Sequence, residues 1–275
     1  MNLPYAEVIG DPVAQSKSPL IHNFWLEHAG LSGTYRKTRI LSEALSKYFA
    51  NRVADGDWRG CNVTLPHKIA VANLVDRLDE QAVKVGAVNT VVKSGSGLTG
   101  YNTDVDGVLA ALPQTSMNSD TRVCLIGAGG AARAAIAACA LRKVQDLSVV
   151  ARSGDTAQAL LDEFQMNGRV GPLHDAASGI LEADVVINAT PLGMMGKPEM
   201  PQWIVEAIEN SSGKVVFDMV YAPLETALLA ASQRGGHQAV DGLTMLIGQA
   251  GRAFRLFFGA DPMGDDALLR QTLLK

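Results

Sequence analysis

Two side chains suited to moving a proton, Lys68 and Asp104, each follow a predicted strand in the first part of the chain. Lys68 comes shortly after the strand 60–64, and Asp104 comes after a hairpin that ends at residue 101. Reduction of a carbonyl needs a proton donor at the oxygen that receives the electrons of the hydride. The pair fits this chemistry. Lys68 could instead be a solvated surface charge, and Asp104 could instead cap a helix. His67, next to Lys68, is an alternative proton donor.

A glycine cluster follows the apolar run 123–126 near the middle of the chain. Gly127, Gly129 and Gly130 precede Ala132 in the spacing that dinucleotide-binding loops use between a strand and a helix. The first glycine permits a tight turn, the second admits a pyrophosphate, and the helix start offers free N–H groups to it. We expect a bound dinucleotide here, and the alternative is a strand-to-helix turn without a ligand.

Arg152 ends the next predicted strand, 147–151, about 20 residues beyond the glycines. An acidic residue at this position accepts from the ribose 2′-hydroxyl of NAD, whereas an arginine accommodates the 2′-phosphate of NADP. Arg152 therefore favours NADP and argues against S-adenosylmethionine. Asp155 nearby opposes a 2′-phosphate by its charge, which keeps NAD open.

Ser16 and Ser18 lie just before a predicted helix, 19–29. Two hydroxyls beside a helix N-terminus are suited to binding a carboxylate. Ser18 precedes Pro19 and also fits a helix cap with proline in the first helical position, a duty that Ser16 does not have. The two readings of Ser18 remain open at this point.

The elements that position these residues alternate between strand and helix, which indicates α/β architecture with parallel sheets and helical crossovers. In the first part we predict strands at 5–10, 33–41, 60–64, 87–92 and 98–101, and helices at 19–29, 42–53 with Ser42 as cap, 68–74, 79–85 and 104–112. In the second part we predict strands at 122–126, 147–151, 184–189 and 214–219, and helices at 130–141, 155–165 and 223–233. The polar segment 113–120 is typical of a linker. The amphipathic helix 243–258 need not join the parallel sheet, and its return to the first part would make that domain discontinuous.

The composition excludes several classes of partner. The chain has 275 residues, of which 47% are hydrophobic, and a net charge of -4, which argues against nucleic acid and anionic membranes. Its three cysteines, Cys61, Cys124 and Cys139, match no zinc or redox motif and suit a reducing compartment. Neither a signal peptide nor a run of transmembrane length is evident. We expect a cytoplasmic protein without a metal, with a small-molecule substrate.

Seven motifs occur in order between Ile9 and Gln249: Ser16-Lys17-Ser18-Pro19; Asn62-Val63-Thr64 with Pro66 and Lys68; Gly86-Ala87-Val88-Asn89-Thr90; Asn102-Thr103-Asp104; Gly127-Ala128-Gly129-Gly130-Ala131; Asn188-Ala189-Thr190 with Gly193-Met194; and Asp241-Gly242-Leu243 with Met245, Leu246 and Gln249. Together they closely resemble the shikimate dehydrogenase family, which also includes dehydrogenases of quinate. This resemblance implies NADP-dependent, reversible reduction of 3-dehydroshikimate to shikimate, in aromatic amino-acid and chorismate biosynthesis.

The resemblance also implies roles for single residues. Lys68 and Asp104 are the implied catalytic pair. The implied substrate-binding residues are Ser16, Ser18, Thr64, Lys68, Asn89, Asp104, Tyr221 and Gln249. The implied cofactor-binding residues are Gly127, Ala128, Gly129, Gly130, Ala131, Arg152, Thr190, Met194, Met219, Gly242 and Met245.

The implied architecture has two α/β domains with a cleft between them. Residues 1–105 and 241–275 form a substrate-binding catalytic domain with a mixed sheet, and 106–240 form a Rossmann-type NADP-binding domain. We expect a monomer or homodimer. The family often has a second basic residue after the arginine, where this chain has Asp155, so an NAD-preferring quinate/shikimate dehydrogenase is the alternative. A non-catalytic dinucleotide sensor is less favoured, because Lys68 and Asp104 are both present. The roles of His67 and Asp106 are left open.

Overall fold

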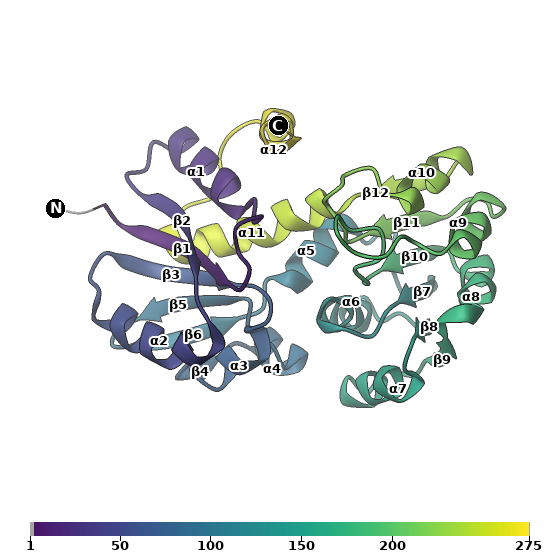
Figure 1. Ribbon diagram of the computed structural model, residues 1–275, viewed down its shortest axis with the longest axis horizontal. Helices are drawn as coiled ribbons and strands as arrows, with labels where there is room; N and C mark the ends of the chain where they lie inside the picture. Colours follow the sequence, from purple (N-terminus) through teal and green to yellow (C-terminus); the bar gives the residue numbers. More distant parts are fainter. Residues whose placement is uncertain (1–2, 275) are drawn as a thin grey trace. The chain divides into compact units, whose positions relative to one another are not determined.

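The computed structural model describes residues 3–274, which form two compact units (Figure 1). The first unit contains the residues up to Thr103 and those from Gln249 onward, and the second contains Asp104–Gly248. The sequence predicted one domain of residues 1–105 and 241–275 and another of residues 106–240, and these boundaries stay predictions. Residues 1, 2 and 275 lie outside the described part. Each unit is an α/β domain, as the sequence predicted, and each contains one six-stranded sheet.

The sheet of the first unit is mixed, with the strand order β2-β1-β3-β5-β6-β4. Strands β1, β2 and β3 are parallel, β5 runs antiparallel to both β3 and β6, and β4 is parallel to β6. The strands are β1 (Tyr5–Gly10), β2 (Thr34–Arg39), β3 (Trp58–Val63), β4 (Arg77–Leu78), β5 (Thr90–Ser94) and β6 (Gly97–Tyr101). The helices are α1 (Ser18–His28), α2 (Leu45–Ala54), α3 (Lys68–Ala72), α4 (Glu80–Val85), α12 (Asp266–Leu274) and the later part of α11 (Gly242–Phe258).

Both faces of this sheet are covered, because every residue of β1 is buried. Ala6 and Val8 point to one face, where they pack with Phe257 from α11. Tyr5 and Ile9 alternate to the other face and join a cluster with residues of α2, α3 and α4. The expectation that the long C-terminal helix packs on the first domain is therefore met by its second half.

The sheet of the second unit is entirely parallel, with the order β12-β11-β10-β7-β8-β9. With β7 taken as the first strand, this is the 3-2-1-4-5-6 order of a doubly wound dinucleotide fold. The strands are β7 (Arg122–Ile126), β8 (Asp146–Ala151), β9 (Arg169–Pro172), β10 (Val185–Asn188), β11 (Val215–Asp218) and β12 (Gln238–Val240). The helices are α5 (Asp104–Ala111), α6 (Gly130–Leu141), α7 (Gly154–Glu163), α8 (Ala176–Glu182), α9 (Gln202–Glu209), α10 (Ala227–Arg234) and the first part of α11.

Several predicted elements begin elsewhere for identifiable reasons. The helix predicted at 223–233 begins at Ala227, because the Thr226 side chain accepts from the Leu229 N–H and caps it there. The helix predicted at 42–53 is divided into a 3₁₀ turn (Ser42–Ala44) and α2, and no side chain caps α2. A second 3₁₀ turn (Leu173–Asp175) precedes α8.

The polar segment 113–120 is not a linker. It lies inside the second unit, and Met117 is completely buried there with its sulfur 3.9 Å from Cys139 Sγ. The chain instead passes between the units at Thr103 and Asp104, and again within α11. Within residues 3–274, none of the helices combines the length and the apolar character that crossing a membrane requires.

Candidate active site

The loops that follow β1 and β3 are hydrogen-bonded to each other at the carboxyl ends of these parallel strands. The Asp11 N–H donates to the Leu65 carbonyl at 3.0 Å. A Cβ at Gly10 would lie 2.4 Å from the methyl carbon of Thr64, so glycine allows the close approach of the two loops. Because ligands of open α/β sheets bind beyond the carboxyl ends of strands, these loops form a candidate site.

Ser16 lies in the first of these loops, and Ser18 follows it as the first residue of α1. The Ser16 hydroxyl accepts from the Ser18 N–H and donates to the Ser18 hydroxyl, both at 3.3 Å. Helix α1 begins at Ser18 itself, with Lys17 in the capping position and no side-chain cap. The reading of Ser18 as the helix cap is therefore wrong, and Ser16 is the serine that bonds to the backbone. Lys17 points its amine to the Leu273 carbonyl of α12.

Lys68 is the first residue of α3 and is half-buried. Its carbonyl accepts from the Val88 N–H at 2.8 Å, which holds the helix start against the loop before β5. The adjacent His67 is buried, and its Nε2 lies 2.7 Å from the Ile40 carbonyl. A carbonyl only accepts, so this nitrogen carries the hydrogen and is engaged with the backbone. Of the two neighbours, Lys68 is therefore the one suited to proton transfer.

Asn89 is held by the segment that follows the hairpin. Its Oδ1 accepts from the Thr103 N–H at 2.7 Å, and its Nδ2 donates to Thr103 Oγ1 at 3.0 Å. Thr103 Oγ1 also lies 3.3 Å from Gln249 Oε1 at the point where α11 enters the first unit. All three side chains are buried. The structure thus brings Asn89 and Gln249, two predicted substrate-binding residues, onto one shared threonine.

Asp104 is the first residue of α5 and is half-buried. It shares the first helical turn with Asp106, where the helix dipole favours negative charge. Thr103 belongs to the first unit and Asp104 to the second. Lys68 also belongs to the first unit, so the pairing of Lys68 with Asp104 in catalysis stays a prediction.

The glycine loop after β7 has the geometry of a phosphate cradle. Gly127 has φ +109°, and a Cβ there would lie 2.8 Å from the methyl carbon of Thr190. Gly129 precedes α6 in extended conformation, and no side chain caps the helix. A Cβ at Gly129 or Gly130 would meet no atom within 4 Å, so this loop faces open space. Open space at a helix N-terminus fits the pyrophosphate of a dinucleotide.

Arg152 lies directly after β8 and is exposed. Its guanidinium makes no hydrogen bond or ion pair with any residue of the described range 3–274. The next residue, Ser153, caps α7 by accepting from the Thr156 N–H at 3.2 Å. Asp155 is exposed in the first turn of this helix. The arginine is thus available for an external anion, in the position expected for the 2′-phosphate.

A buried network that sequence reasoning missed joins the loops after β10 and β11. Asn188 Nδ2 donates to Asp218 Oδ1 at 2.9 Å, and Asn188 Oδ1 accepts from the Thr190 hydroxyl at 2.6 Å. Asp218 Oδ2 accepts from the Thr226 hydroxyl at 2.6 Å. Burial raises the pKa of Asp218, while these hydrogen bonds oppose the shift. A carboxylate ending the apolar run 215–217 was the available signal in the sequence.

The remaining predicted cofactor residues lie around these loops. A Cβ at Gly242 would lie 2.5 Å from the Met219 carbonyl oxygen, so the start of α11 passes directly over the loop after β11. Met194, Met219 and Met245 are partly exposed. Tyr221, a predicted substrate residue, is also partly exposed, and burial of its ring raises its pKa. Ala128 lies in the loop between β7 and α6, and Ala131 lies in the first turn of α6.

Glu7 on β1 is a second residue that the sequence did not identify. It is completely buried, and its carboxylate accepts from Arg52 Nε at 2.7 Å, from the Tyr48 hydroxyl at 2.8 Å and from the Thr38 hydroxyl. Burial alone would raise the pKa of Glu7, but these hydrogen bonds outweigh it and lower the pKa below the usual 4.5. Nothing in the stretch 5–10 indicates a buried ion pair, because its partners come from distant segments.

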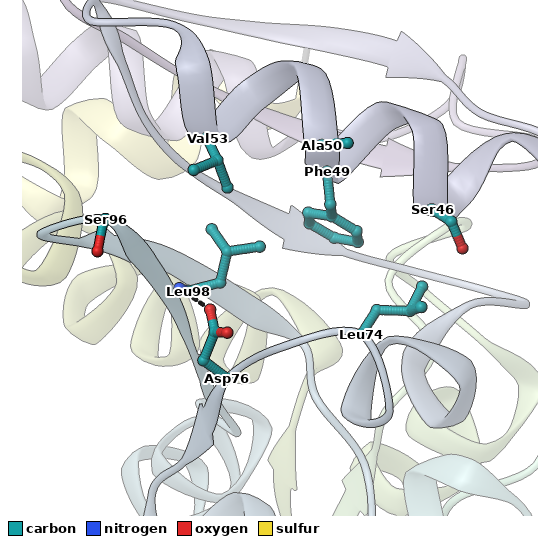
Figure 2. A pocket seen from close by; sticks show the side chains of 8 residues that line it. All are labelled: Ser46, Phe49, Ala50, Val53, Leu74, Asp76, Ser96 and Leu98. Atoms are coloured by element: carbon teal, nitrogen blue, oxygen red, sulfur yellow. Dashed lines mark hydrogen bonds between the residues drawn. The ribbon is translucent and has the colours of Figure 1, made fainter.

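A pocket in the first unit lies away from the predicted site residues. Figure 2 shows Phe49 and Val53 of α2 facing Leu74 and Leu98 across it. Its one carboxylate, Asp76, accepts from the Leu98 N–H at 2.6 Å. The lining is mostly apolar and that carboxylate is engaged with the backbone, so the pocket offers little for catalysis.

Two family models match the chain. Residues 8–91 match the model described as "Shikimate dehydrogenase substrate binding domain". Residues 110–218 match the model described as "Shikimate / quinate 5-dehydrogenase".

Individual relatives match over nearly the whole chain. A shikimate dehydrogenase (NADP(+)) of Sphingopyxis alaskensis is 45% identical over 98% of this chain and 97% of its own length. The structure of shikimate 5-dehydrogenase from Thermus thermophilus, in complex with NADP(H) and shikimate, has a TM-score of 0.84 at 33% identity and covers 98% of both chains. The enzyme from Listeria monocytogenes, in complex with shikimate and NAD, has a TM-score of 0.88 at 27% identity over 98% of this chain and 96% of that chain.

Proposed function

The chain belongs to the shikimate dehydrogenase family, and from this membership we propose how its residues divide the work. Its activity is the NADP-dependent, reversible reduction of 3-dehydroshikimate to shikimate, a step of the shikimate pathway. The observation that carries the proposal is the hydrogen-bonded pair of loops after β1 and β3, which bear Ser16, Ser18, Thr64 and Lys68.

The substrate carboxylate binds to the hydroxyls of Ser16 and Ser18, with Tyr221 assisting. Both serines lie at the start of α1, where the helix dipole favours a negative group. Thr64, Asn89 and Gln249 bind the ring hydroxyls. Their amide and hydroxyl groups donate and accept, as recognition of an alcohol requires.

Lys68 is the proton donor in reduction and the proton acceptor in oxidation. It donates to the ketone oxygen as that oxygen gains electrons, which stabilises the developing alkoxide. Asp104 is the second member of the proposed catalytic pair and binds a substrate hydroxyl. Positioning of the reactants supplies much of the rate.

The dinucleotide is held by Gly127, Ala128, Gly129, Gly130 and Ala131 through their backbone, and its 2′-phosphate by Arg152. Thr190, Met194, Met219, Gly242 and Met245 bind its nicotinamide end. When bound, NADP supplies the hydride acceptor or, once reduced, the hydride donor. The network of Asn188 and Asp218 orders the loop that carries Thr190.

We also infer a cytoplasmic location and a monomer or homodimer. The location is supported by three cysteines that are buried and unpaired. Light scattering on the purified chain measures the oligomeric state.

Paired steady-state kinetics test the proposed function. We expect oxidation of shikimate with NADP to have a kcat/KM at least about tenfold above that with NAD, because Arg152 offers bidentate contacts to the 2′-phosphate. We expect shikimate to be preferred over quinate in the same assay, which follows the absorbance of the reduced cofactor. A preference for NAD, or for quinate, would contradict the proposal and favour the NAD-preferring quinate/shikimate dehydrogenase.

A further inference from the structure

Tyr35 is fixed to helix α1 although it belongs to β2. It is buried, its N–H donates to Asn23 Oδ1 at 2.8 Å, and its carbonyl accepts from Asn23 Nδ2 at 2.9 Å. Its ring also stacks on His22, with the centroids 4.1 Å apart and an interplanar angle of 4°. Both partners belong to α1, so Tyr35 moves with the helix that begins at Ser18.

The hydroxyl of Tyr35 connects this helix to β3. It donates to Asn62 Oδ1 at 2.6 Å, in a completely buried contact. Burial raises the pKa of Tyr35. The Tyr35 side chain thus connects helix α1, through Asn23 and His22, with Asn62 near the end of β3.

From Asn62 the hydrogen bonds continue to the residues proposed to bind the substrate ring. Asn62 Nδ2 donates to Thr90 Oγ1 at 2.9 Å, and Thr90 Oγ1 donates to Asn89 Oδ1 at 2.9 Å. Each donor in this series receives a hydrogen bond from the previous member, so the bonds polarise one another in one direction. Asn89 Nδ2 in turn donates to Thr103 Oγ1, which donates to Gln249 Oε1.

We propose that Tyr35 is a positioning residue, which holds the carboxylate-binding serines and the ring-binding residues Asn89 and Gln249 at a fixed spacing. This inference rests on the proposed function, because it assigns those residues to the substrate. Tyr35 itself does not touch the reacting atoms. Its hydroxyl sets which end of the Asn62 amide faces Thr90, and therefore the orientation of the Asn89 amide.

The variant Tyr35→Phe tests the proposal, because it removes the hydroxyl and keeps the ring that stacks on His22. We expect the KM for shikimate to rise about tenfold, while the KM for NADP stays within about twofold of the wild-type value. The matched control is Tyr48→Phe in the same unit, where a buried hydroxyl donates to Glu7 at 2.8 Å and has no bond to the series. We expect Tyr48→Phe to lower the melting temperature and leave the KM for shikimate unchanged.

The variants Thr90→Val and Thr90→Ser provide a second test of the same series of hydrogen bonds. Their KM values for shikimate decide whether the proposal holds if Tyr35→Phe does not fold. Loss of the hydroxyl in the valine variant is expected to raise the KM for shikimate, and the serine variant is expected to keep the wild-type value. An unchanged KM in Tyr35→Phe, an equal rise in Tyr48→Phe, or equal values in both Thr90 variants would overturn the proposal. A wild-type chain that does not oxidise shikimate with NADP would instead overturn the proposed function.

Discussion

The two units offer their candidate binding groups in different ways. The first unit offers side chains, such as Ser16, Lys68 and Asn89, and the amide of Asn89 is oriented by hydrogen bonds with Thr103, 14 residues away. The second unit offers mainly backbone, where Gly129 and Gly130 leave open space at the start of α6. Arg152 is the main side chain that adds to this second site.

This difference follows from the two ligands. A pyrophosphate is an anion with many equivalent oxygens, so backbone N–H groups and a helix dipole bind it without a particular side chain. A ring with several hydroxyls and one ketone needs donors and acceptors at fixed positions, and one group with a proton to give. Substitutions in the first unit should therefore affect chemistry and substrate, and those in the second should mostly affect the cofactor.

Lys68→Ala is the strongest test of this division. We expect kcat to fall by about 10²- to 10⁴-fold with little change in the KM for NADP, because the proton donor is lost and the cofactor site is intact. The measurement is the rate of shikimate oxidation, with Lys47→Ala, an exposed lysine of α2, as the control. Near-normal activity in Lys68→Ala would remove this residue from the mechanism.

Glu7→Gln tests whether every buried polar group of the first unit serves the substrate. We expect a loss of about 3 kcal/mol in the free energy of unfolding, because Arg52 loses its counter-ion, with the KM values unchanged. Urea unfolding measures the loss, and Glu43→Gln, at an exposed site, is the control. A changed KM for shikimate would extend the substrate machinery to this ion pair.

The stability that the Glu7 carboxylate contributes to the wild type should depend on pH, and this dependence should be absent in Glu7→Gln. The pKa of Glu7 is lower in the folded protein than its usual 4.5, so the ionised carboxylate stabilises the fold at pH values above 4.5. This contribution is lost as the pH falls from 4.5 through the folded-state pKa. Acid unfolding of Glu7→Gln should therefore depend less steeply on pH in that range than acid unfolding of the wild type.

Arg152→Ala is expected to have the smallest effect. Because the backbone loop still holds the pyrophosphate, we expect the KM for NADP to rise about tenfold, or about 1.4 kcal/mol, with the KM for NAD unchanged. Arg234→Ala, an exposed arginine of α10, controls for the change in net charge. Equal changes for both cofactors would show that Arg152 does not distinguish them.

The sequence was sufficient for features that depend on local spacing. The strand at Tyr5–Gly10 and the helix at Gly130–Leu141 begin and end in the structure where they were predicted. The glycine loop was recognisable because a strand, three glycines and a helix are contiguous. Strands β4, β9 and β12 were not predicted, since runs of 2 to 4 residues are too short to show alternation.

Features that depend on tertiary contacts could not be predicted from local spacing in the sequence. A capping role was one of the two readings of Ser18 that its neighbour Pro19 allowed, but the structure gives the local bond to Ser16. The partners of Glu7 lie 29 to 45 residues away, at Arg36, Thr38, Tyr48 and Arg52. The roles of Tyr35 and Asn62 likewise emerge only when α1, β2 and β3 are placed together.

Helix α11 has a consequence for the order in which the chain acquires its structure during synthesis. A Cβ at Gly60 would lie 2.7 Å from the Phe257 ring, so this C-terminal side chain rests directly on the backbone of β3. The ribosome makes residues 104–248 before it makes Phe257, so the dinucleotide unit has its whole sequence available first. Helix α1 covers part of the same face of the amino-terminal sheet, but the area under Phe257 stays uncovered until α11 is made, so this sheet is completed after the sequence of the dinucleotide unit is available.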